Sequence, residues 1–338
     1  MRPLHHGGRL REAACRYAIP LDGWLDLSTG INPLGWPVPM LSADCWQRLP
    51  EEDDGLEQTA AAYYGSDELL PVAGSQAAIQ ALPRLRMAAR VGMLWPSYAE
   101  HAAAWRAAGH EVVELRADAI ERMLPQLDVL LLVNPNNPTG ECFTLAQLLA
   151  WRQALSARGG WLVVDEAFVD ATPERSLAHH AGEEGLVVLR SLGKFFGLAG
   201  VRVGFVFAWP GLRQRLAALL GPWSVSGPSR EVARLALADI PWQATNRAGL
   251  QRDSERLHIL LASHGLTPAG GTALFCYCQS EAAAGLHEAL ARQGILTRLF
   301  HDPAALRFGL PGSDEEWRRL ACGLAAVLTT TTQKAVQC

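Results

Sequence analysis

Residues 185–208 read GLVVLRSLGKFFGLAGVRVGFVFA, two apolar runs joined by a glycine-rich segment that carries one lysine. The runs at 185–191 and 203–208 are typical of strands covered on both faces, because they lack the polar alternation of a half-exposed strand. Lysine is seldom buried without a partner or a chemical task. Lys194 therefore marks this connection as a candidate site in a layered fold.

More apolar runs of this kind precede the quoted stretch, and amphipathic segments separate them. Such alternation of strands and helices implies right-handed crossovers and a mainly parallel sheet, so the sequence predicts an α/β fold. The predicted strands are 91–96, 111–116, 129–135 and 160–167, and the predicted helices are 98–109, 144–159 and 173–182.

The pattern changes near residue 228, where we expect a second, smaller α+β domain to begin. Helices over 229–264 are followed by a strand (273–279), a helix (281–294), two short strands (295–300 and 306–310) and a last helix from Ser313. We therefore predict a large domain over 41–227, a small domain over 228–330 and a tail without periodicity over 331–338.

The composition excludes several classes of protein. The 338 residues are 49% hydrophobic with a formal net charge of −4, so the chain folds and offers no broad basic surface to nucleic acid or anionic lipid. Seven scattered cysteines without a CxxC pair predict reduced thiols; Cys276 and Cys278 are expected on one face of a strand, although a metal pair stays open. Since no signal peptide or run of about 18 apolar residues is present, we expect a soluble cytoplasmic protein. Since the cysteines lack a partner motif, we expect no metal site.

Four polar clusters fall where predicted strands end and helices begin, which is where ligands gather in parallel sheets. In AGSQAAIQ (73–80), a small turn opens a helix and Ser75 adds a hydroxyl donor; an ordinary helix cap stays open as the alternative. In NPNNPTG (134–140), two prolines and a glycine fix the turn and place Asn134, Asn136 and Asn137, although asparagine also favours plain turns.

The other two clusters carry charge. In VVDEAF (163–168), Asp165 follows an apolar strand, where a carboxylate needs a cation or a hydrogen bond; a helix cap or a buried ion pair is the alternative. Lys194 with Ser191 and Arg202 could form a simple anion pocket. A desolvated lysine has a lowered pKa, however, and can form a Schiff base with a phosphorylated aldehyde.

In order along the chain, GSQA, PSY, NPNNPTG, DEAF and SxGKxxGLAGxRxG resemble the fold-type I pyridoxal-phosphate enzymes of the class I and II aminotransferase group. The resemblance implies a mainly parallel seven-stranded sheet in the large domain, pyridoxal 5'-phosphate as cofactor and a homodimer. It implies that Lys194 is catalytic and binds the cofactor covalently, and that catalytic Asp165 pairs with the pyridinium nitrogen. The other cofactor residues that it implies are Asn137 at the phenolic oxygen, Tyr98 on the ring face, and Ser75, Gln76, Ser191 and Arg202 at the phosphate.

The N-terminal segment narrows this resemblance. LHHGGRLREAA (4–14) followed by DLSTGINPLGWP (26–37) resembles the branch that decarboxylates L-threonine O-3-phosphate to (R)-1-amino-2-propanol O-2-phosphate in cobalamin biosynthesis. It implies that residues 1–40 pack with the small domain and the substrate site. The substrate-binding residues that it implies are His6, Gly7, Asn32, Asn137, Arg298 and Arg307, whose donors match a carboxylate and a phosphate.

Two positions depart from the family pattern. Phe168 replaces a tyrosine that gives the phenolic oxygen a second donor, and Leu49 replaces one that reaches the neighbouring subunit. A histidinol-phosphate aminotransferase or a related class I or II aminotransferase is the alternative, and the HGG and INPLG stretches argue against it. A dinucleotide-binding oxidoreductase lacks its G-x-G-x-x-G here. A ligand-sensing regulator would need a DNA-binding module for which we find no room before residue 30.

Overall fold

The computed structural model describes residues 6–336, with side chains described as far as Leu328, and divides into two units. The larger unit contains Gly35–Asn137 and Glu141–Thr245. The smaller unit contains the chain up to Leu34, the short piece Pro138–Gly140 and the chain from Asn246 onwards. Among the described residues, no helix is long and apolar enough to cross a membrane.

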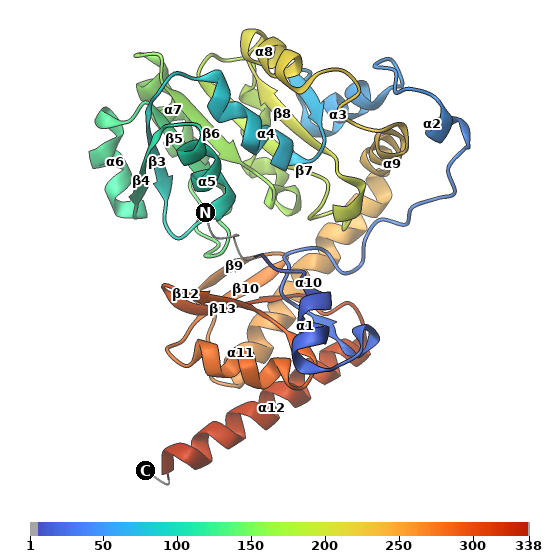
Figure 1. Cartoon of the computed structure of the whole chain (residues 1–338), viewed down its shortest axis with the longest axis vertical. Coiled ribbons are helices and arrows are strands. Elements are labelled where there is room, and N and C mark those ends of the chain that lie inside the picture. The colour runs from blue at the N-terminus through green and yellow to red at the C-terminus, as the bar shows by residue number, and fades with distance from the viewer. Residues whose placement is uncertain (1–5, 337–338) are drawn as a thin grey trace. The chain divides into compact units, whose positions relative to one another are not determined.

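A mixed seven-stranded sheet forms the centre of the larger unit (Figure 1). Its strand order is β2-β8-β7-β6-β5-β3-β4, in which β3 to β7 are parallel and β8 runs antiparallel to both neighbours. The strands are β2 (Leu69–Val72), β3 (Arg90–Leu94), β4 (Glu111–Leu115), β5 (Val129–Val133), β6 (Trp161–Asp165), β7 (Leu186–Ser191) and β8 (Gly204–Ala208). The helices are α2 (Asp44–Gln47), α3 (Leu56–Tyr64), α4 (Ser75–Ala81), α5 (Ala99–Ala107), α6 (Ile120–Met123), α7 (Leu145–Ser156), α8 (Pro210–Leu220) and α9 (Gly227–Ala238).

Helices cover both faces of this sheet, as the apolar strands predict. On one face, α4, α5 and α8 share a buried cluster with alternate residues of the strands, which Figure 1 shows as helices along one side. On the other face, Tyr64 of α3 packs against Phe205 and Phe207 of β8, with ring centroids 5.4 and 5.2 Å apart. The six predicted strands are confirmed. β2 was not predicted, because it has four residues and a proline, which is tolerated at a sheet edge.

The helix predicted over 173–182 is wrong. The chain instead forms short 3₁₀ turns at Val169–Ala171, Pro173–Arg175 and Ala178–His180. The Glu166 carboxylate accepts the Leu177 N–H at 2.7 Å and the Ser176 hydroxyl at 2.6 Å. These bonds take the place of helical backbone bonds, so the segment folds around a side chain that its own periodicity cannot reveal.

The boundary between the units lies later than predicted, at 245 instead of near 228. Arg230 of α9 binds Asp54 at 2.6 Å and Glu57 at 2.7 Å, which ties this helix to the start of α3. Trp242, near the start of α10 (Ile240–Ser263), stacks on Phe196 with centroids 5.6 Å apart. The larger unit therefore keeps α9 and the first residues of α10.

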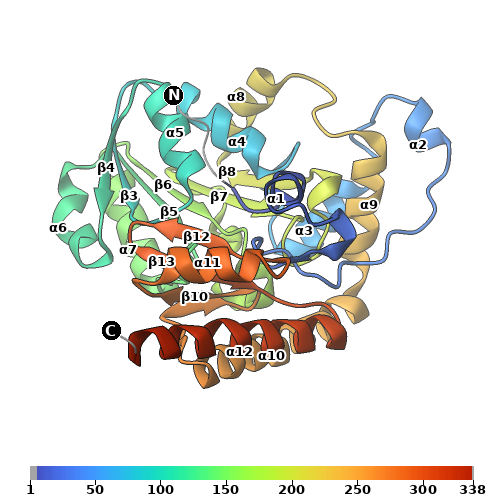
Figure 2. The same cartoon turned by 60° about the horizontal axis from the view of Figure 1, so that its bottom comes forward.

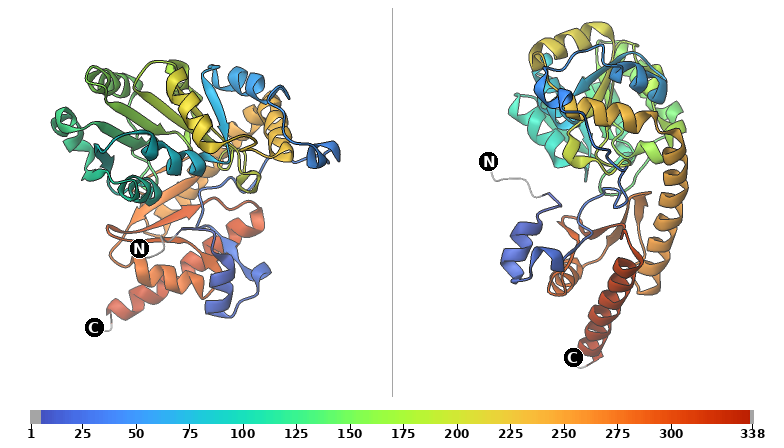
Figure 3. Two further views of the ribbon diagram at one scale, coloured as in Figure 1. Left: turned by 45° about the horizontal axis from the view of Figure 1, so that its top comes forward. Right: turned by 90° about the vertical axis from the view of Figure 1, so that its right-hand side faces the viewer.

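The smaller unit is built on a four-stranded antiparallel sheet with the order β12-β13-β10-β9. The segment predicted as one strand over 295–300 forms two strands. β11 pairs in parallel with β1 of the N-terminal segment, whereas β12 joins the four-stranded sheet. Figure 2 shows α10 and α12 side by side, and Figure 3 shows α1 beside α11. The elements are α1 (Leu10–Tyr17), β1 (Leu25–Asp26), β9 (Gly270–Thr272), β10 (Phe275–Gln279), α11 (Ala283–Ala291), β11 (Ile295–Leu296), β12 (Arg298–His301), β13 (Ala304–Gly309) and α12 (Asp314–Val336).

Two further expectations concern the end of this unit. Cys276 and Cys278 lie two apart on β10 and are both buried, as expected for one apolar face of a strand. The tail predicted over 331–338 is helical through Val336, because no glycine or proline interrupts α12 there. Residues 337 and 338 lie outside the described residues.

Candidate active site

The strand register of the larger unit gathers the four polar clusters at one edge of the sheet. Val133 of β5 pairs with Asp165 of β6, and Asp165 pairs with Leu189 of β7, so the turns after these strands begin level with one another. Gly204 of β8 pairs with both Ser191 and Val72, which brings in the turn before α4. Segments 72–76, 134–137, 165–168 and 191–204 therefore meet at this edge.

Asp165 is held from two sides. It is 3% exposed, its Oδ2 lies 2.9 Å from Nε2 of buried His101, and its Oδ1 accepts the Ala167 N–H at 3.0 Å. His101 comes from α5, and its ring contacts Tyr98 edge to face at 5.9 Å between centroids. The sequence analysis missed His101, although its place one helical turn after Tyr98 is a signal that could have revealed it.

The Lys194 loop is anchored by aromatic packing. Phe195 and Phe196 are buried and lie 5.7 and 5.6 Å from Trp242, while the Gly193 N–H donates to the Ser191 hydroxyl at 3.2 Å. Lys194 itself is half-buried, with Nζ 5.9 Å from the ring centroid of Phe168. Phe168 is buried, so the side chain that replaces the family's tyrosine presents a hydrocarbon face to the amine.

Arg202 lies over the turn that precedes α4. Gly74 has φ of 73°, and a Cβ there would lie 2.6 Å from Nη2 of Arg202. A Cβ on Gly204 would lie 2.6 Å from the backbone nitrogen of Ser75. Arg202 itself has φ of 57°, a left-handed conformation that residues other than glycine adopt at a cost. The two glycines thus let the Arg202 guanidinium and the backbone nitrogen of Ser75 pack closely at this turn.

Gln76 binds both Tyr98 and the Glu100 carboxylate. The Tyr98 hydroxyl donates to Gln76 Oε1 at 3.3 Å, and Gln76 Nε2 donates to Glu100 at 2.9 Å. Burial, and then the charges of Glu100 and Asp165, raise the pKa of Tyr98 to about 12. Tyr98 therefore presents a neutral ring at this edge of the sheet.

Two of the three asparagines in the 134–140 turn have structural roles. Asn134 accepts the Phe143 N–H at 2.8 Å, whereas Asn136 donates to the Pro96 carbonyl at 2.9 Å and accepts the Ser97 hydroxyl at 2.8 Å. Asn137 is half-buried, while the other two are buried. Asn137 is therefore the most accessible of the three amides.

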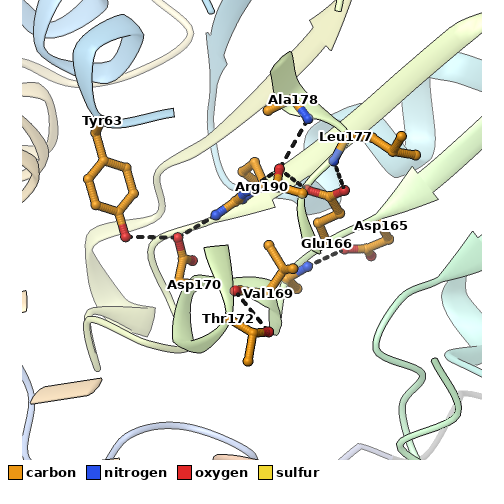
Figure 4. A network of polar contacts seen from close by, with 11 residues as sticks. Tyr63, Asp165, Glu166, Val169, Asp170, Thr172, Leu177, Ala178 and Arg190 are labelled. Atoms are coloured by element: carbon orange, nitrogen blue, oxygen red, sulfur yellow. Dashed lines mark hydrogen bonds and ion pairs between the residues drawn. The ribbon is translucent and has the colours of Figure 1, made fainter. Parts of the chain in front are cut away.

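A buried charge network lies behind this edge (Figure 4). Arg190 binds Asp170 at 2.5 Å and Glu166 at 3.2 Å, all three being at most 2% exposed, and Tyr63 donates to Asp170 at 3.0 Å. Because side chains alternate along a strand, Glu166 and Arg190 point to the face opposite Asp165 and Ser191. We refer to Glu166, Asp170 and Arg190 as the buried triad; the sequence analysis missed it.

The smaller unit holds a cluster of arginines. Arg298 of β12 and Arg307 of β13 are cross-strand partners. Arg307 is buried, its Nη2 donates to the Ser28 carbonyl at 2.8 Å, and its guanidinium lies 5.0 Å from the ring centroid of Phe275. Burial, and then the charge of Arg298, lower the pKa of Arg307 to about 10, with Asp26 opposing the shift.

His6 and Gly7 line a pocket of about 650 Å³ together with Arg298. Gly7 packs so closely on Ser28 that a Cβ would lie 2.2 Å from its carbonyl oxygen, and the Gly8 N–H donates to the Ser28 hydroxyl at 2.7 Å. Asn32 is buried in the same unit, with Nδ2 donating to Asn246 at 2.9 Å and Oδ1 accepting the Leu34 N–H at 3.0 Å. His6, Gly7 and Arg298 are thus brought together, while Asn32 supports its own turn and α10.

The comparisons with known proteins agree on one family. The family model for aminotransferase class I and II matches residues 49–326. The chain is 57% identical to a threonine-phosphate decarboxylase of Pseudomonas aeruginosa, over 95% of this chain and 97% of the relative. It is 43% identical to a threonine-phosphate decarboxylase of Sinorhizobium sp, over 96% and 98% respectively. The solved histidinol-phosphate aminotransferase of Sinorhizobium meliloti in complex with pyridoxal-5'-phosphate aligns with a TM-score of 0.80 at 20% identity, over 98% of this chain and 96% of that one.

Proposed function

The chain belongs to the aminotransferase class I and II family, and we propose that it decarboxylates L-threonine O-3-phosphate to (R)-1-amino-2-propanol O-2-phosphate, a step of cobalamin biosynthesis. The observation that carries the proposal is the 57% identity to a threonine-phosphate decarboxylase over nearly the whole of both chains. That alignment covers 321 residues and so extends over both units.

The larger unit fits pyridoxal 5'-phosphate, the cofactor of this family. Gly74 lets the Arg202 guanidinium lie close to the turn before α4, and Gly204 lets the Ser75 backbone nitrogen lie close to β8, since a Cβ at either glycine would lie 2.6 Å from these groups. Guanidinium and backbone N–H donors match an anionic phosphate. We assign Ser75, Gln76, Ser191 and Arg202 to that phosphate, although Gln76 also binds Glu100. Tyr98 would lie against the ring face, Asn137 would donate to the phenolic oxygen, and Lys194 would form the covalent bond to the cofactor.

Asp165 and Lys194 perform the acid–base work. When bound, the cofactor supplies a conjugated ring that accepts the electron pair left at the substrate Cα as CO₂ departs. Asp165, fixed by His101, keeps a proton on the ring nitrogen and so keeps the ring electron-poor. Lys194 returns a proton to Cα, which balances the loss of CO₂.

The substrate's two anionic groups determine which bond at Cα is broken, since fixing both fixes the orientation of Cα. We assign Arg298 and Arg307 to these groups, with His6, Gly7, Asn32 and Asn137 as further donors. Phe168 gives the phenolic oxygen no second donor, so Asn137 is its main partner in this chain.

We also propose an oligomeric state and a cellular location, from the exposed surface and from the cysteine content. A homodimer is supported by large apolar side chains that lie exposed along one segment of the larger unit: Val38, Met40, Trp46 and Leu49. The replacement of tyrosine by Leu49 removes one contact that the family makes across subunits, but adds apolar surface. A cytoplasmic location is in keeping with the six cysteines of the described residues, all of which are free thiols.

The decisive test is to incubate purified protein and pyridoxal phosphate with O-phosphothreonine and to measure CO₂ release. We expect release with the wild-type protein and none with Lys194→Ala, which should also lose the yellow absorbance that borohydride abolishes in the wild type. Transamination of histidinol phosphate without CO₂ release from O-phosphothreonine would instead identify an aminotransferase.

A further inference from the structure

Arg9 belongs to the same pocket as the proposed substrate residues. The pocket of about 650 Å³ in the smaller unit is lined by His6, Gly7 and Arg298, and also by Arg9, which follows the HGG turn directly. Arg9 is the residue just before α1, so its backbone is set by the start of that helix. Nothing in the family resemblance assigns it a role.

The turn that carries Arg9 is fixed to the residue that holds Arg307. The Ser28 hydroxyl accepts a hydrogen bond from the Gly8 N–H at 2.7 Å, and the Ser28 carbonyl accepts one from the Arg307 guanidinium at 2.8 Å. Gly7 packs so closely against the same carbonyl that a Cβ on Gly7 would overlap with it. Ser28 thus joins the start of the chain to β13, and Arg9 is held beside the arginine pair by backbone contacts that do not involve its own side chain.

Arg9 and Arg307 each lie close enough to Arg298 for like charges to repel. Burial, and then the charge of Arg9, lower the pKa of Arg298, and Arg298 in turn lowers that of Arg307. The carboxylates that oppose this repulsion are Asp26, which acts on Arg307, and Glu12, which pairs with Arg9 at 2.9 Å. The Arg9–Glu12 pair is exposed, with 42% and 60% of the two side chains accessible, and such pairs hold each other weakly.

We propose that Arg9 is a phosphate-binding residue, which forms with Arg298 a two-arginine subsite for the phosphate of the substrate and leaves Arg307 to the carboxylate. The proposal rests on the proposed function for its substrate. O-Phosphothreonine carries about −1.5 to −2 on its phosphate and −1 on its carboxylate, so three guanidinium groups match its anionic charge. Because a phosphate dianion is costlier to desolvate than a carboxylate, it suits the more exposed arginines, Arg9 and Arg298. The carboxylate, with a single charge, suits the buried Arg307.

Glu12 positions Arg9 in the absence of ligand. Its carboxylate, in the first turn of α1, accepts a hydrogen bond from Nη1 of Arg9, and Glu12 also lines the pocket. A phosphate that enters the pocket replaces this exposed carboxylate as the partner of Arg9. Phosphate binding therefore replaces the weak Arg9–Glu12 ion pair with two charge-assisted contacts, one from Arg9 and one from Arg298.

The test compares Arg9→Ala with Arg11→Ala, a matched arginine on the same exposed helix that does not line this pocket. Binding of inorganic phosphate is measured by calorimetry, and KM and kcat for O-phosphothreonine by CO₂ release. We expect Arg9→Ala to weaken phosphate binding and to raise KM by about 10-fold or more, with kcat changed by less than about threefold, because charge-assisted bonds are worth about 1.5–3 kcal/mol. Arg9→Lys should recover part of the loss.

Equal phosphate affinities in Arg9→Ala, Arg11→Ala and wild type would overturn the inference, as would a loss confined to kcat. The phosphate measurement needs no turnover and so separates the two proposals. If wild type binds phosphate through Arg9 but releases no CO₂ from O-phosphothreonine, the proposed function fails and the phosphate subsite stands.

Discussion

Arg298 and Arg307 lie directly opposite each other on the neighbouring antiparallel strands β12 and β13. Like charges in this arrangement destabilise a sheet, and the burial of Arg307 makes the arrangement costlier still. The hydrogen bond from Arg307 to the Ser28 carbonyl and its contact with the Phe275 ring offset part of this cost, but neither removes the repulsion between the two guanidinium groups. The pair is in keeping with the proposed substrate, which carries two negative groups.

Replacing Arg307 by alanine should impair substrate binding and spare the cofactor. Arg307 belongs to the smaller unit, whereas every residue assigned to the cofactor belongs to the larger one. We expect KM for O-phosphothreonine to rise by about 10- to 100-fold, the value of one charge-assisted bond, with the yellow absorbance unchanged. Arg318→Ala, on the exposed face of α12, is the control. Loss of colour together with activity would indicate misfolding and contradict the assignment.

The affinity for acetate, a probe for the carboxylate that we assign to Arg307, should fall above about pH 10. The free protein holds Arg307 with a pKa of about 10, owing to burial and Arg298 and despite Asp26. A bound anion favours the charged guanidinium, so the complex keeps a proton that the free protein loses, and affinity falls by about tenfold per pH unit above 10. Calorimetry from pH 8 to 11 measures the slope. Arg307→Met should bind more weakly throughout and lack this added decline; a decline of equal slope in the variant would assign it to another group.

Gly74→Ala should weaken cofactor binding through the displacement of Arg202. Alanine at φ of 73° is strained, and its Cβ would lie 2.6 Å from the Arg202 guanidinium. Gly109→Ala is a matched control, because Gly109 has φ of 89° and nothing within 4 Å of a Cβ. Both variants should lose about 1–2 kcal/mol of unfolding free energy as apoproteins from the left-handed backbone.

Only Gly74→Ala should also bind pyridoxal phosphate about tenfold more weakly or worse, because it moves a charged donor. Titration of each apoprotein with the cofactor, followed by absorbance, separates the two effects. Equal cofactor affinity in the two variants would show that Arg202 does not hold the phosphate.

The sequence predicted those parts of the fold that depend on local patterns. Strands such as 129–133 and 186–191 are wholly apolar, so their position in a doubly covered sheet follows from composition alone. The segment 173–182 has helical spacing but folds around Glu166, whose bonds to Ser176 and Leu177 leave no trace in periodicity. The later domain boundary likewise depends on Arg230 reaching Asp54, 176 residues away.

The residues of the candidate site, like the elements of the fold, were predictable where a local sequence pattern reveals them. Asp165, Lys194 and Arg202 stand out because charge follows or interrupts apolar sequence at strand ends. Their supporting residues stand out less: His101 lies 64 residues from Asp165 in the chain, and its local sign is its place one helical turn after Tyr98. Arg9 looked like one of several arginines near the N-terminus until the structure placed it in the pocket with Arg298.

Removing the cation of the buried triad should cost more stability than removing any surface ion pair. Arg190→Met leaves Glu166 and Asp170 buried at 0% exposure without their cation. We expect the apoprotein to lose about 3–5 kcal/mol of unfolding free energy in urea, the cost of an uncompensated buried charge. Arg234→Met removes a pair with Glu231 within α9, in which both side chains are about a third exposed, and should cost less than about 1 kcal/mol.

The loss in Arg190→Met should also depend on pH. Burial already raises the pKa of Glu166, with Arg190 opposing the shift, so the variant should raise it further. A carboxyl whose pKa is higher in the folded state loses stability as pH rises through that pKa, and the loss in the variant then extends to higher pH. The difference between wild type and variant should be smaller at pH 5.5 than at pH 8, and Glu166→Gln added to Arg190→Met should recover part of it. A difference that is the same at both pH values, or no larger than that of Arg234→Met, would mean that Arg190 holds this segment by packing and not by charge.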